Sequence, residues 1–271
     1  MPTNPEIKVF LIARTAVDHG AVRQWLDHIG ADEFEIPEGE DDPTFLVALA
    51  AKRCYMSFQP GLNPNVTKIR KDMVEYFDNL LASRHGSVFE HSVFSFAIEG
   101  VTRVFTAEMN RHRAGWAISE GSLRFIRFDQ NIPFWMPDSL QDAPGDDDDL
   151  LLRKSESRKL FMWAFRHQEI IYEQLMGLWN MNDKDKNFAY KKKVTSALRR
   201  IVGMGVSTGG VWTGNVRALR HVIAARTDPA AEEEIHHVFM GIGKHMMDHY
   251  SRMFGDFTGW PDSLVPQHPK V

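Results

Sequence analysis

Three basic side chains, Arg111, His112 and Arg113, are adjacent in the sequence, and a polar run with a further arginine follows at residues 119–124. Two guanidiniums and an imidazole this close repel one another, so the cluster is unfavourable unless an anion neutralises it. Phosphate is a natural partner, because the planar guanidinium fork donates to two phosphate oxygens at once. The alternative is a solvated basic helix end, which the helix dipole stabilises. The cluster alone leaves both interpretations open.

A second group of titratable residues occupies positions 85–91, which contain two histidines and Glu90. Neither H-E-x-x-H nor a cysteine–histidine spacing is present, so the pattern disfavours a metal site. Glu90 and His91 fit equally well as capping or hydrogen-bonding residues of their own loop.

A third group lies on a helix expected over residues 214–226. Arg217 and His221 form an i,i+4 pair on one stripe of this helix, while Asn215 and Arg226 fall on another stripe. Polar groups on more than one face indicate a helix that is either solvated or surrounded by several partners. Arg226 follows the apolar run Ile-Ala-Ala, so if it is buried it needs an anionic or carbonyl partner.

Other chemistries find little support. The sequence contains no G-x-S-x-G, no P-loop and no G-x-G-x-x-G after a strand. The one cysteine, Cys54, sits on a helical apolar pattern, which favours a buried structural thiol over a nucleophile. A single cysteine also excludes an internal disulfide and indicates a reducing, cytoplasmic compartment.

Composition narrows the class of protein further. With 271 residues, 43% of them hydrophobic and 25% charged, the chain can bury the core of one compact domain or of two closely packed lobes. Its net charge of -4 lacks the basic excess of proteins that bind nucleic-acid polymers. No segment approaches the roughly 18 uncharged apolar residues of a membrane span, and no secretion signal is expected.

The three polar clusters must be positioned by a fold that contains both strands and helices. Apolar, β-prone residues predict strands over 8–12, 92–98 and 123–128. Apolar residues at helical spacing predict helices over 18–29, 44–56, 66–83 and 101–113. The second half is predicted to be helical over 150–180, 186–202, 214–226 and 229–253, with a glycine-rich bend at 203–214.

Three segments together resemble the flavin-dependent thymidylate synthases. They are HGSVFEHSVFSFAIEGVTR at 85–103, RHR with SEGSLRF within 111–125, and NVRALRHVIAARTDPAAEEEI at 215–235. Each segment alone is only suggestive, but chance agreement of all three in the family's order is improbable. The similarity extends from about Lys8 to Met253.

The resemblance implies a homotetramer with a mixed α/β fold of the thymidylate-synthase-complementing-protein type, in which a small sheet accompanies a large helical part. The whole chain, 1–271, would form a single domain, with active sites built at subunit interfaces. FAD would contact Ser87, Glu90, Arg111, His112, Arg113, Asn215, Arg217 and His221. The uridylate would contact Glu108, Glu120, Ser122, Leu123, Arg124, Arg200 and Arg226.

The implied reaction is C5-methylation of a uridylate, dUMP to dTMP, and it needs no cysteine. NADPH would reduce FAD, 5,10-methylenetetrahydrofolate would supply the one-carbon unit, and reduced flavin would supply the hydride. Arg226 would stabilise negative charge as it develops on the uracil oxygen. The clustered arginines would neutralise the phosphates of the dinucleotide and of the nucleotide.

The sequence departs from the family's pattern in the loops. Eight residues separate Arg113 from Ser122, where seven are usual, and residues 200–215 are one residue short. Ala230 stands where the family often has histidine. These departures bear on the identity of the substrate more than on the fold or the flavin.

Glu108 is a further departure, because the family usually has glutamine there, near the substrate base. A carboxylate only accepts hydrogen bonds, so it would repel uracil carbonyls and favour a hydroxyl donor, such as the 2′-hydroxyl of UMP. The other interpretation is a pair with Arg111 or His112 on the same helix. A protein of this scaffold that binds flavin or nucleotide without catalysis, or a helical nucleotide-binding module without flavin, also stays open.

Overall fold

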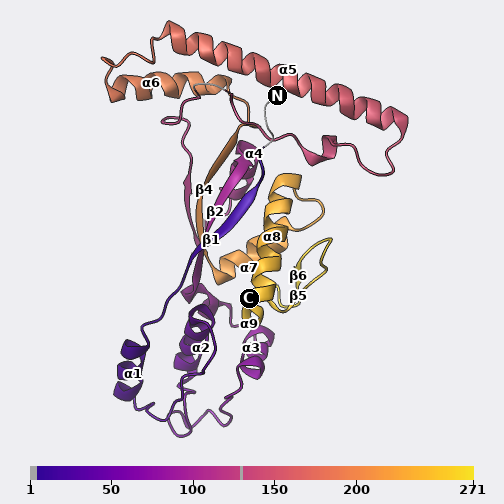
Figure 1. Cartoon of the computed structure of the whole chain (residues 1–271). Coiled ribbons are helices and arrows are strands. Elements are labelled where there is room, and N and C mark those ends of the chain that lie inside the picture. The colour runs from indigo at the N-terminus through magenta and orange to yellow at the C-terminus, as the bar shows by residue number, and fades with distance from the viewer. Residues whose placement is uncertain (1–4, 129–130) are drawn as a thin grey trace. The chain divides into compact units, whose positions relative to one another are not determined.

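The computed structural model of the chain describes residues 5–128 and 131–271 (Figure 1). Four strands form one sheet in the hydrogen-bonded order β1-β2-β4-β3, with bounds β1 Lys8–Arg14, β2 Val93–Thr102, β3 Trp116–Glu120 and β4 Ser207–Asn215. A second, antiparallel sheet pairs β5 (Phe257–Thr258) with β6 (Val265–Pro266). Helices make up most of the other elements, so the predicted mixed α/β fold with a small sheet and a large helical part is confirmed.

The chain folds as two compact units, and the boundary between them falls within each strand of the larger sheet. Of the described residues, the first unit contains 5–8, 98–111, 118–128 and 131–211. The second unit contains Val9–Ala97, His112–Ala117 and Trp212–Val271. That the chain acts as one functional domain stays a prediction.

The first unit is dominated by one long helix. Its helical elements are α4 (Arg103–Met109), η2 (Asp138–Leu140), α5 (Asp148–Leu178), α6 (Phe188–Leu198) and η3 (Arg199–Ile201). The side chain of Asp147 caps α5 by accepting from the N–H of Leu150. Figure 1 shows α6 alongside the end of α5, and Tyr172, Met176 and Val194 share a buried core there. Among the described residues, no helix is both long enough and apolar enough to cross a membrane.

The second unit packs short helices around a core of its own. Its helical elements are α1 (His19–His28), α2 (Asp42–Tyr55), α3 (Met73–Ala82), η1 (Gly86–His91), α7 (Val216–Arg226), α8 (Glu233–His249) and α9 (Ser251–Phe254). α7 packs against both α8 and η1. Its buried residues are Val216, Leu219, Arg220, Val222 and Ile223. The four apolar residues of this set lie at helical spacing and hold the opposite, polar face of α7 in place.

The predicted glycine-rich bend at 203–214 is wrong, because most of that segment is β4. The glycines allow neighbouring side chains to approach the strand. A Cβ atom at Gly209 would lie 1.8 Å from Glu99 Oε2, and one at Gly214 would lie 2.9 Å from the ring of Trp116. Close approach, and not turn geometry, explains these glycines.

The predicted strand at 123–128 is also wrong. The N–H groups of Phe125 and Ile126 both donate to the carbonyl of Ser122 at 2.9 Å, which closes a turn directly after β3. The strand of this region is β3, at Trp116–Glu120, where the alternation of half-buried and exposed residues is present but short.

Two predicted helices are shorter than expected. α3 begins only at Met73, because the side chain of Asp72 caps it by accepting from the N–H of Glu75 at 2.8 Å. α4 ends at Met109 with Asn110 as its C-cap. Arg111, His112 and Arg113 therefore lie in the loop beyond α4 and not within a helix.

Candidate functional site

An ion pair between Arg217 and Glu90 joins α7 to η1. Nη1 of Arg217 lies 2.6 Å from Oε1 of Glu90, although the two residues are 127 positions apart. The guanidinium passes close to Gly86, where a Cβ atom would lie 2.9 Å from Arg217 Nε. The two side chains are 44% and 48% exposed, so a polar ligand can reach the pair. Two of the predicted cofactor residues are thus brought together.

Asn215 fixes the start of α7. Its side-chain oxygen accepts from the N–H of Ala218 at 2.8 Å, and its own N–H donates to the carbonyl of Gly115 at 3.0 Å. The cap satisfies one of the donors that the first helical turn leaves unpaired. Gly115 has a φ of 75°, and a Cβ there would meet Ala218 at 2.7 Å, so the segment after Arg113 packs tightly onto this turn.

Ser87 and Arg217 line a cavity of about 420 Å³ together with Arg84 and His85. Cys54 lines the same cavity and is exposed, so the expectation of a buried structural cysteine is wrong. The buried face of α2 carries Phe45, Leu49 and Lys52, and Cys54 points away from it. In the described part of the chain, no group of three or more His, Cys, Asp or Glu side chains could hold a metal ion.

His112, His221 and Arg226 form one cluster. Nε of Arg226 donates to Nε2 of His112 at 2.8 Å, and the rings of His112 and His221 are 6.0 Å apart in an edge-to-face arrangement. In this bond the half-buried Arg226 donates to an imidazole. His112 accepts in this bond, so its Nε2 carries no proton there.

The basic residue that α7 does bury is Arg220, which is 1% exposed. Its Nη1 and Nη2 atoms lie 2.7 and 2.9 Å from the two carboxylate oxygens of Asp256, a bidentate pair. Nη1 also donates to the carbonyl of Met253, and the guanidinium lies 4.9 Å from the ring centroid of Phe257. Arg220 is therefore structural, and it ties α7 to the C-terminal segment.

In the first unit, Glu120 is held by two residues that the sequence did not single out. Nη1 of Arg103 lies 3.0 Å from Oε1 of Glu120, and Nδ2 of Asn110 lies 3.3 Å from its Oε2. Arg103 also donates to the carbonyl of Gly121. Arg103 belongs to the segment 85–103 that carries the family resemblance, which is the only signal that pointed to it.

Two of the residues predicted for the nucleotide, Arg124 and Arg200, contact Ser196. Nε of Arg124 donates to its hydroxyl at 3.0 Å, and Nη1 of Arg200 donates to its carbonyl at 2.7 Å. The hydroxyl of Ser122 accepts from the N–H of Arg124 at 3.3 Å, and Leu123 between them is half-buried. Ser196 was missed, because a lone serine within a helix carries no signal of its own.

Glu108 and Arg111 form the pair that their i,i+3 spacing allows, at the limit of 4.0 Å between Oε1 and Nη1. Arg111 is 74% exposed and Glu108 is 30% exposed. Arg113 is exposed as well. Every predicted cofactor residue except Arg111 lies in the second unit, and every predicted substrate residue except Arg226 lies in the first.

Comparison with known proteins shows which family this chain matches. The model of the thymidylate synthase complementing protein family matches residues 38–250. The chain is 31% identical over 237 residues to a probable flavin-dependent thymidylate synthase of Mycobacterium phage L5, with 84% of this chain and 88% of the relative covered. It is 28% identical over 255 residues to a flavin-dependent thymidylate synthase of Mycobacteroides abscessus, with 93% and 90% covered.

Solved structures share the fold. A UMP/dUMP methylase, PolB, from Streptomyces cacaoi, bound with 5-Br dUMP, aligns with a TM-score of 0.60 at 19% identity over 93% of this chain and 94% of that one. Thymidylate Synthase X from Helicobacter pylori, with FAD and dUMP, aligns with a TM-score of 0.56 at 16% identity over 93% and 98%. The chain therefore belongs to the thymidylate synthase complementing protein family, the enzyme family of the flavin-dependent thymidylate synthases.

Proposed function

We propose that this chain catalyses the FAD-dependent C5-methylation of a uridylate, converting dUMP to dTMP with 5,10-methylenetetrahydrofolate as carbon donor and NADPH as reductant. Family membership supports the flavin and the class of reaction. The chain would act as one functional domain, without a thiol nucleophile.

The observation that carries the proposal is that Ser87 and Arg217, which are more than a hundred positions apart in the sequence, line one cavity, and that Arg217 is ion-paired with Glu90. The chemistry of this donor set suits the diphosphate of a dinucleotide. Arg84 and Arg217 both line the cavity, and Glu90 offsets only part of their positive charge. Gly86 leaves the space that the Arg217 guanidinium occupies.

The other predicted cofactor residues would surround the cavity that Ser87 and Arg217 line. Asn215 would keep Arg217 in the first turn of α7, and Arg113 would approach through the segment that packs on that turn. His112, His221 and Arg111 complete the set that we assign to FAD. When bound, FAD would supply the hydride that completes the methyl group.

The nucleotide would be held by the group around Ser196. Arg124 and Arg200 converge on that residue, so two guanidiniums are available for one phosphate within a short distance. Ser122 would donate its hydroxyl, Leu123 would border the sugar, and Glu120 would be kept in position by Arg103 and Asn110. Glu108, already near Arg111, would influence which sugar is accepted.

Arg226 is the residue we assign to catalysis. It would donate to a carbonyl of the pyrimidine and stabilise the negative charge that develops there during methyl transfer. Its bond to His112 would fix the plane of the guanidinium, which leaves less motion to be lost when the substrate binds.

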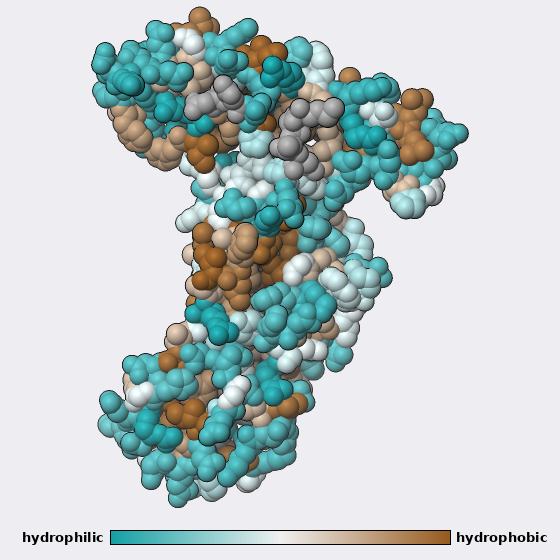
Figure 2. Space-filling model, viewed as in Figure 1, coloured by the Kyte–Doolittle hydropathy of each residue, from teal (hydrophilic) through white to brown (hydrophobic). Residues whose placement is uncertain are grey.

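We also propose that the active enzyme is a homotetramer with active sites at subunit interfaces. The single chain exposes large apolar side chains along α5 and at the start of α6: Leu160 (67%), Trp163 (62%), Leu178 (79%) and Phe188 (68%). Figure 2 shows apolar surface in this part of the molecule, between polar areas. Exposed apolar groups of this size are typical of protein interfaces.

Purified protein loaded with FAD tests the proposal. With dUMP, methylenetetrahydrofolate and NADPH, mass spectrometry should detect dTMP, and omission of any one component should abolish it. A protein that binds FAD and dUMP but forms no methylated product would instead be a binding relative. A protein that binds neither would contradict the assignment of both groups of residues.

A further inference from the structure

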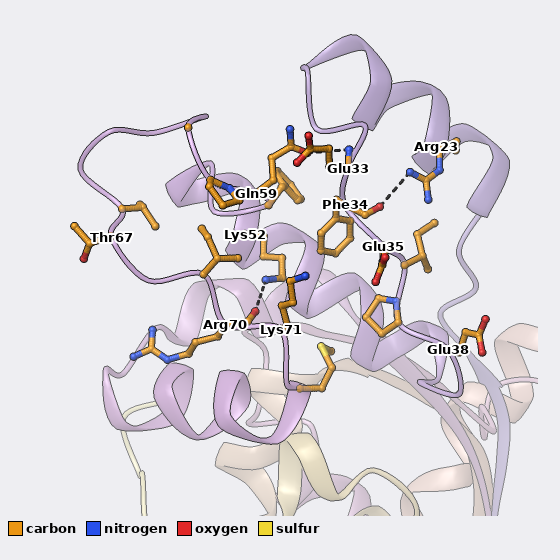
Figure 3. A pocket seen from close by; sticks show the side chains of 18 residues that line it. Arg23, Glu33, Phe34, Glu35, Glu38, Lys52, Gln59, Thr67, Arg70 and Lys71 are labelled. Carbon is orange, nitrogen blue, oxygen red and sulfur yellow. Dashed lines mark hydrogen bonds between the residues drawn. The ribbon is translucent and has the colours of Figure 1, made fainter.

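The second unit contains a second, larger cavity with a different set of lining residues. It has a volume of about 850 Å³, and its walls come from α1, α2, the start of α3 and the segments at 33–38 and 58–71 (Figure 3). None of the predicted cofactor or substrate residues is among those that line it. The volume lies within the usual range of about 300–1,000 Å³ for small-molecule sites.

Lys52 is the buried charged residue among those that line this cavity. Although it is a lysine, it is only 3% exposed. Its ammonium donates to the carbonyl of Arg70 at 3.0 Å and lies 4.4 Å from the ring centroid of Tyr76 and 5.5 Å from that of Phe34. Figure 3 shows the bond from Lys52 to the Arg70 backbone beside the Phe34 ring.

The described residues give Lys52 no counter-ion. Within residues 5–128 and 131–271, no carboxylate lies within ion-pair distance of its ammonium, although Glu33, Glu35 and Glu38 are among the residues that line the cavity. The neighbouring guanidinium of Arg70 is already paired with Glu75, at 3.4 Å.

A buried ammonium without an anion is unfavourable, and burial lowers the pKa of Lys52 to about 8. The ammonium has three N–H donors, and the Arg70 carbonyl takes one of them. Ring faces stabilise a cation but do not neutralise it. An anionic ligand would supply both the charge and the acceptors that the site lacks.

The apolar residues that line the cavity indicate what the uncharged part of the ligand should be. Ile36, Phe58, Val66, Ile69 and Met73 line the cavity, and Phe58 and Met73 are buried core residues. These apolar side chains suit a flat apolar body. A ligand with one negative charge on an aromatic ring satisfies both parts of the cavity.

We propose that this cavity binds a small aromatic carboxylate, with its carboxylate paired to the ammonium of Lys52. The site goes beyond the proposed methylation and does not depend on it. Binding should weaken as the pH rises above about 8, because the unoccupied site then loses the proton that the ligand needs. Charged groups on the surrounding elements are Arg23, Glu33, Glu35, Glu38, Arg70 and Lys71.

Calorimetric titration of the full chain with 1-naphthoate tests the proposal. FAD and dUMP are kept saturating, so that the proposed active site is not open to the probe. One naphthoate per chain should bind at pH 7, and Lys52→Met should weaken it about tenfold or more, as expected for loss of a charged hydrogen-bonding partner. Lys71→Met, which removes an exposed lysine of the same cavity, should change the affinity less than about threefold.

The neutral analogue 1-naphthamide separates charge from shape. It should bind more weakly than 1-naphthoate to the unmodified chain and should not distinguish that chain from Lys52→Met. Equal binding of the two probes, unchanged naphthoate affinity in Lys52→Met, or no naphthoate binding at all would overturn the proposal.

A measurement on the unmodified chain keeps the test independent of the variants' folding. At pH 8.5, above the pKa of about 8, binding of naphthoate should draw a proton onto Lys52. The measured heat should then depend on the ionisation enthalpy of the buffer, and this dependence should vanish at pH 6.5. Naphthoate binding at pH 8.5 without proton uptake would contradict a role for Lys52.

Discussion

Arg226 donates from Nε to Nε2 of His112 across 2.8 Å, although the two residues are 114 positions apart. The bond joins the residue assigned to the pyrimidine to one assigned to the flavin, and both belong to the second unit. Because the imidazole accepts, the neutral ring must carry its proton on Nδ1. His112 can therefore orient Arg226 without adding a second positive charge.

Substitution of Arg226 by alanine should lower kcat about 10²- to 10³-fold, the usual effect of removing one donor to a developing oxyanion. Bound FAD, measured by its absorbance, should stay near one per chain. Arg226→Lys should rescue little of the activity, because a lysine ammonium lacks the planar fork and the Nε donor. Full turnover in Arg226→Ala, or loss of flavin without loss of kcat in the flavin-loaded fraction, would contradict the assigned role.

Gly86→Ala should weaken FAD binding about tenfold, because the new Cβ would lie 2.9 Å from Arg217 Nε and push the guanidinium away from Glu90. Equilibrium titration of apoprotein with FAD measures the effect. The matched control is Gly241→Ala on α8, where nothing lies within 4 Å of the added carbon. That variant should bind FAD normally and be more stable by about 0.5–1 kcal/mol.

The buried pair of Arg220 and Asp256 should dominate the stability of the C-terminal segment. Asp256→Ala leaves a guanidinium that is 1% exposed without its anion, which should destabilise the protein by about 3–5 kcal/mol in urea unfolding. Asp248→Asn breaks the exposed i,i+4 pair with Lys244 and should change stability by less than about 1 kcal/mol. Similar effects of the two substitutions would mean that burial of the first pair has little energetic consequence.

Lys52 should make stability rise with pH. Its folded pKa of about 8 is below the ordinary lysine value of 10.5, so between these values the unfolded chain binds more protons than the folded one. The free energy of unfolding should therefore increase from pH 8 to pH 10.5, relative to Lys52→Met, by up to about 3 kcal/mol. A flat difference between the two proteins over this range would show that the folded ammonium is not desolvated.

Local signals in the sequence predicted much of the fold. The helix α7 and the strand β1 appear where the sequence predicts them. The glycines of β4 were misread, because a glycine that makes room for Glu99 or Trp116 has the same sequence signal as a glycine that makes a turn. Which of the two it is depends on a neighbouring strand that is distant in the sequence.

The geometry of the candidate site likewise depends on contacts between residues that are distant in the sequence. The resemblance indicated Glu90 and Arg217, but their mutual ion pair and the bond from Arg226 to His112 are tertiary contacts that no local pattern encodes. Burial was harder to predict: Lys52 lies on the buried face of α2 and Cys54 on its exposed side, the reverse of what their residue types favour. The helical spacing from Phe45 and Leu49 would have placed Lys52 correctly.

Release of tritium from C5 of the pyrimidine is the most direct test of uridylate methylation by this chain, since the C5 hydrogen must leave when the methyl carbon is attached. The assay offers [5-³H]dUMP and [5-³H]UMP separately to the FAD-loaded protein with NADPH and methylenetetrahydrofolate. Release from dUMP that depends on FAD and on the folate is the predicted result, and comparison with UMP measures the sugar preference. Retention of tritium in both nucleotides, with all components present, would contradict the proposed function.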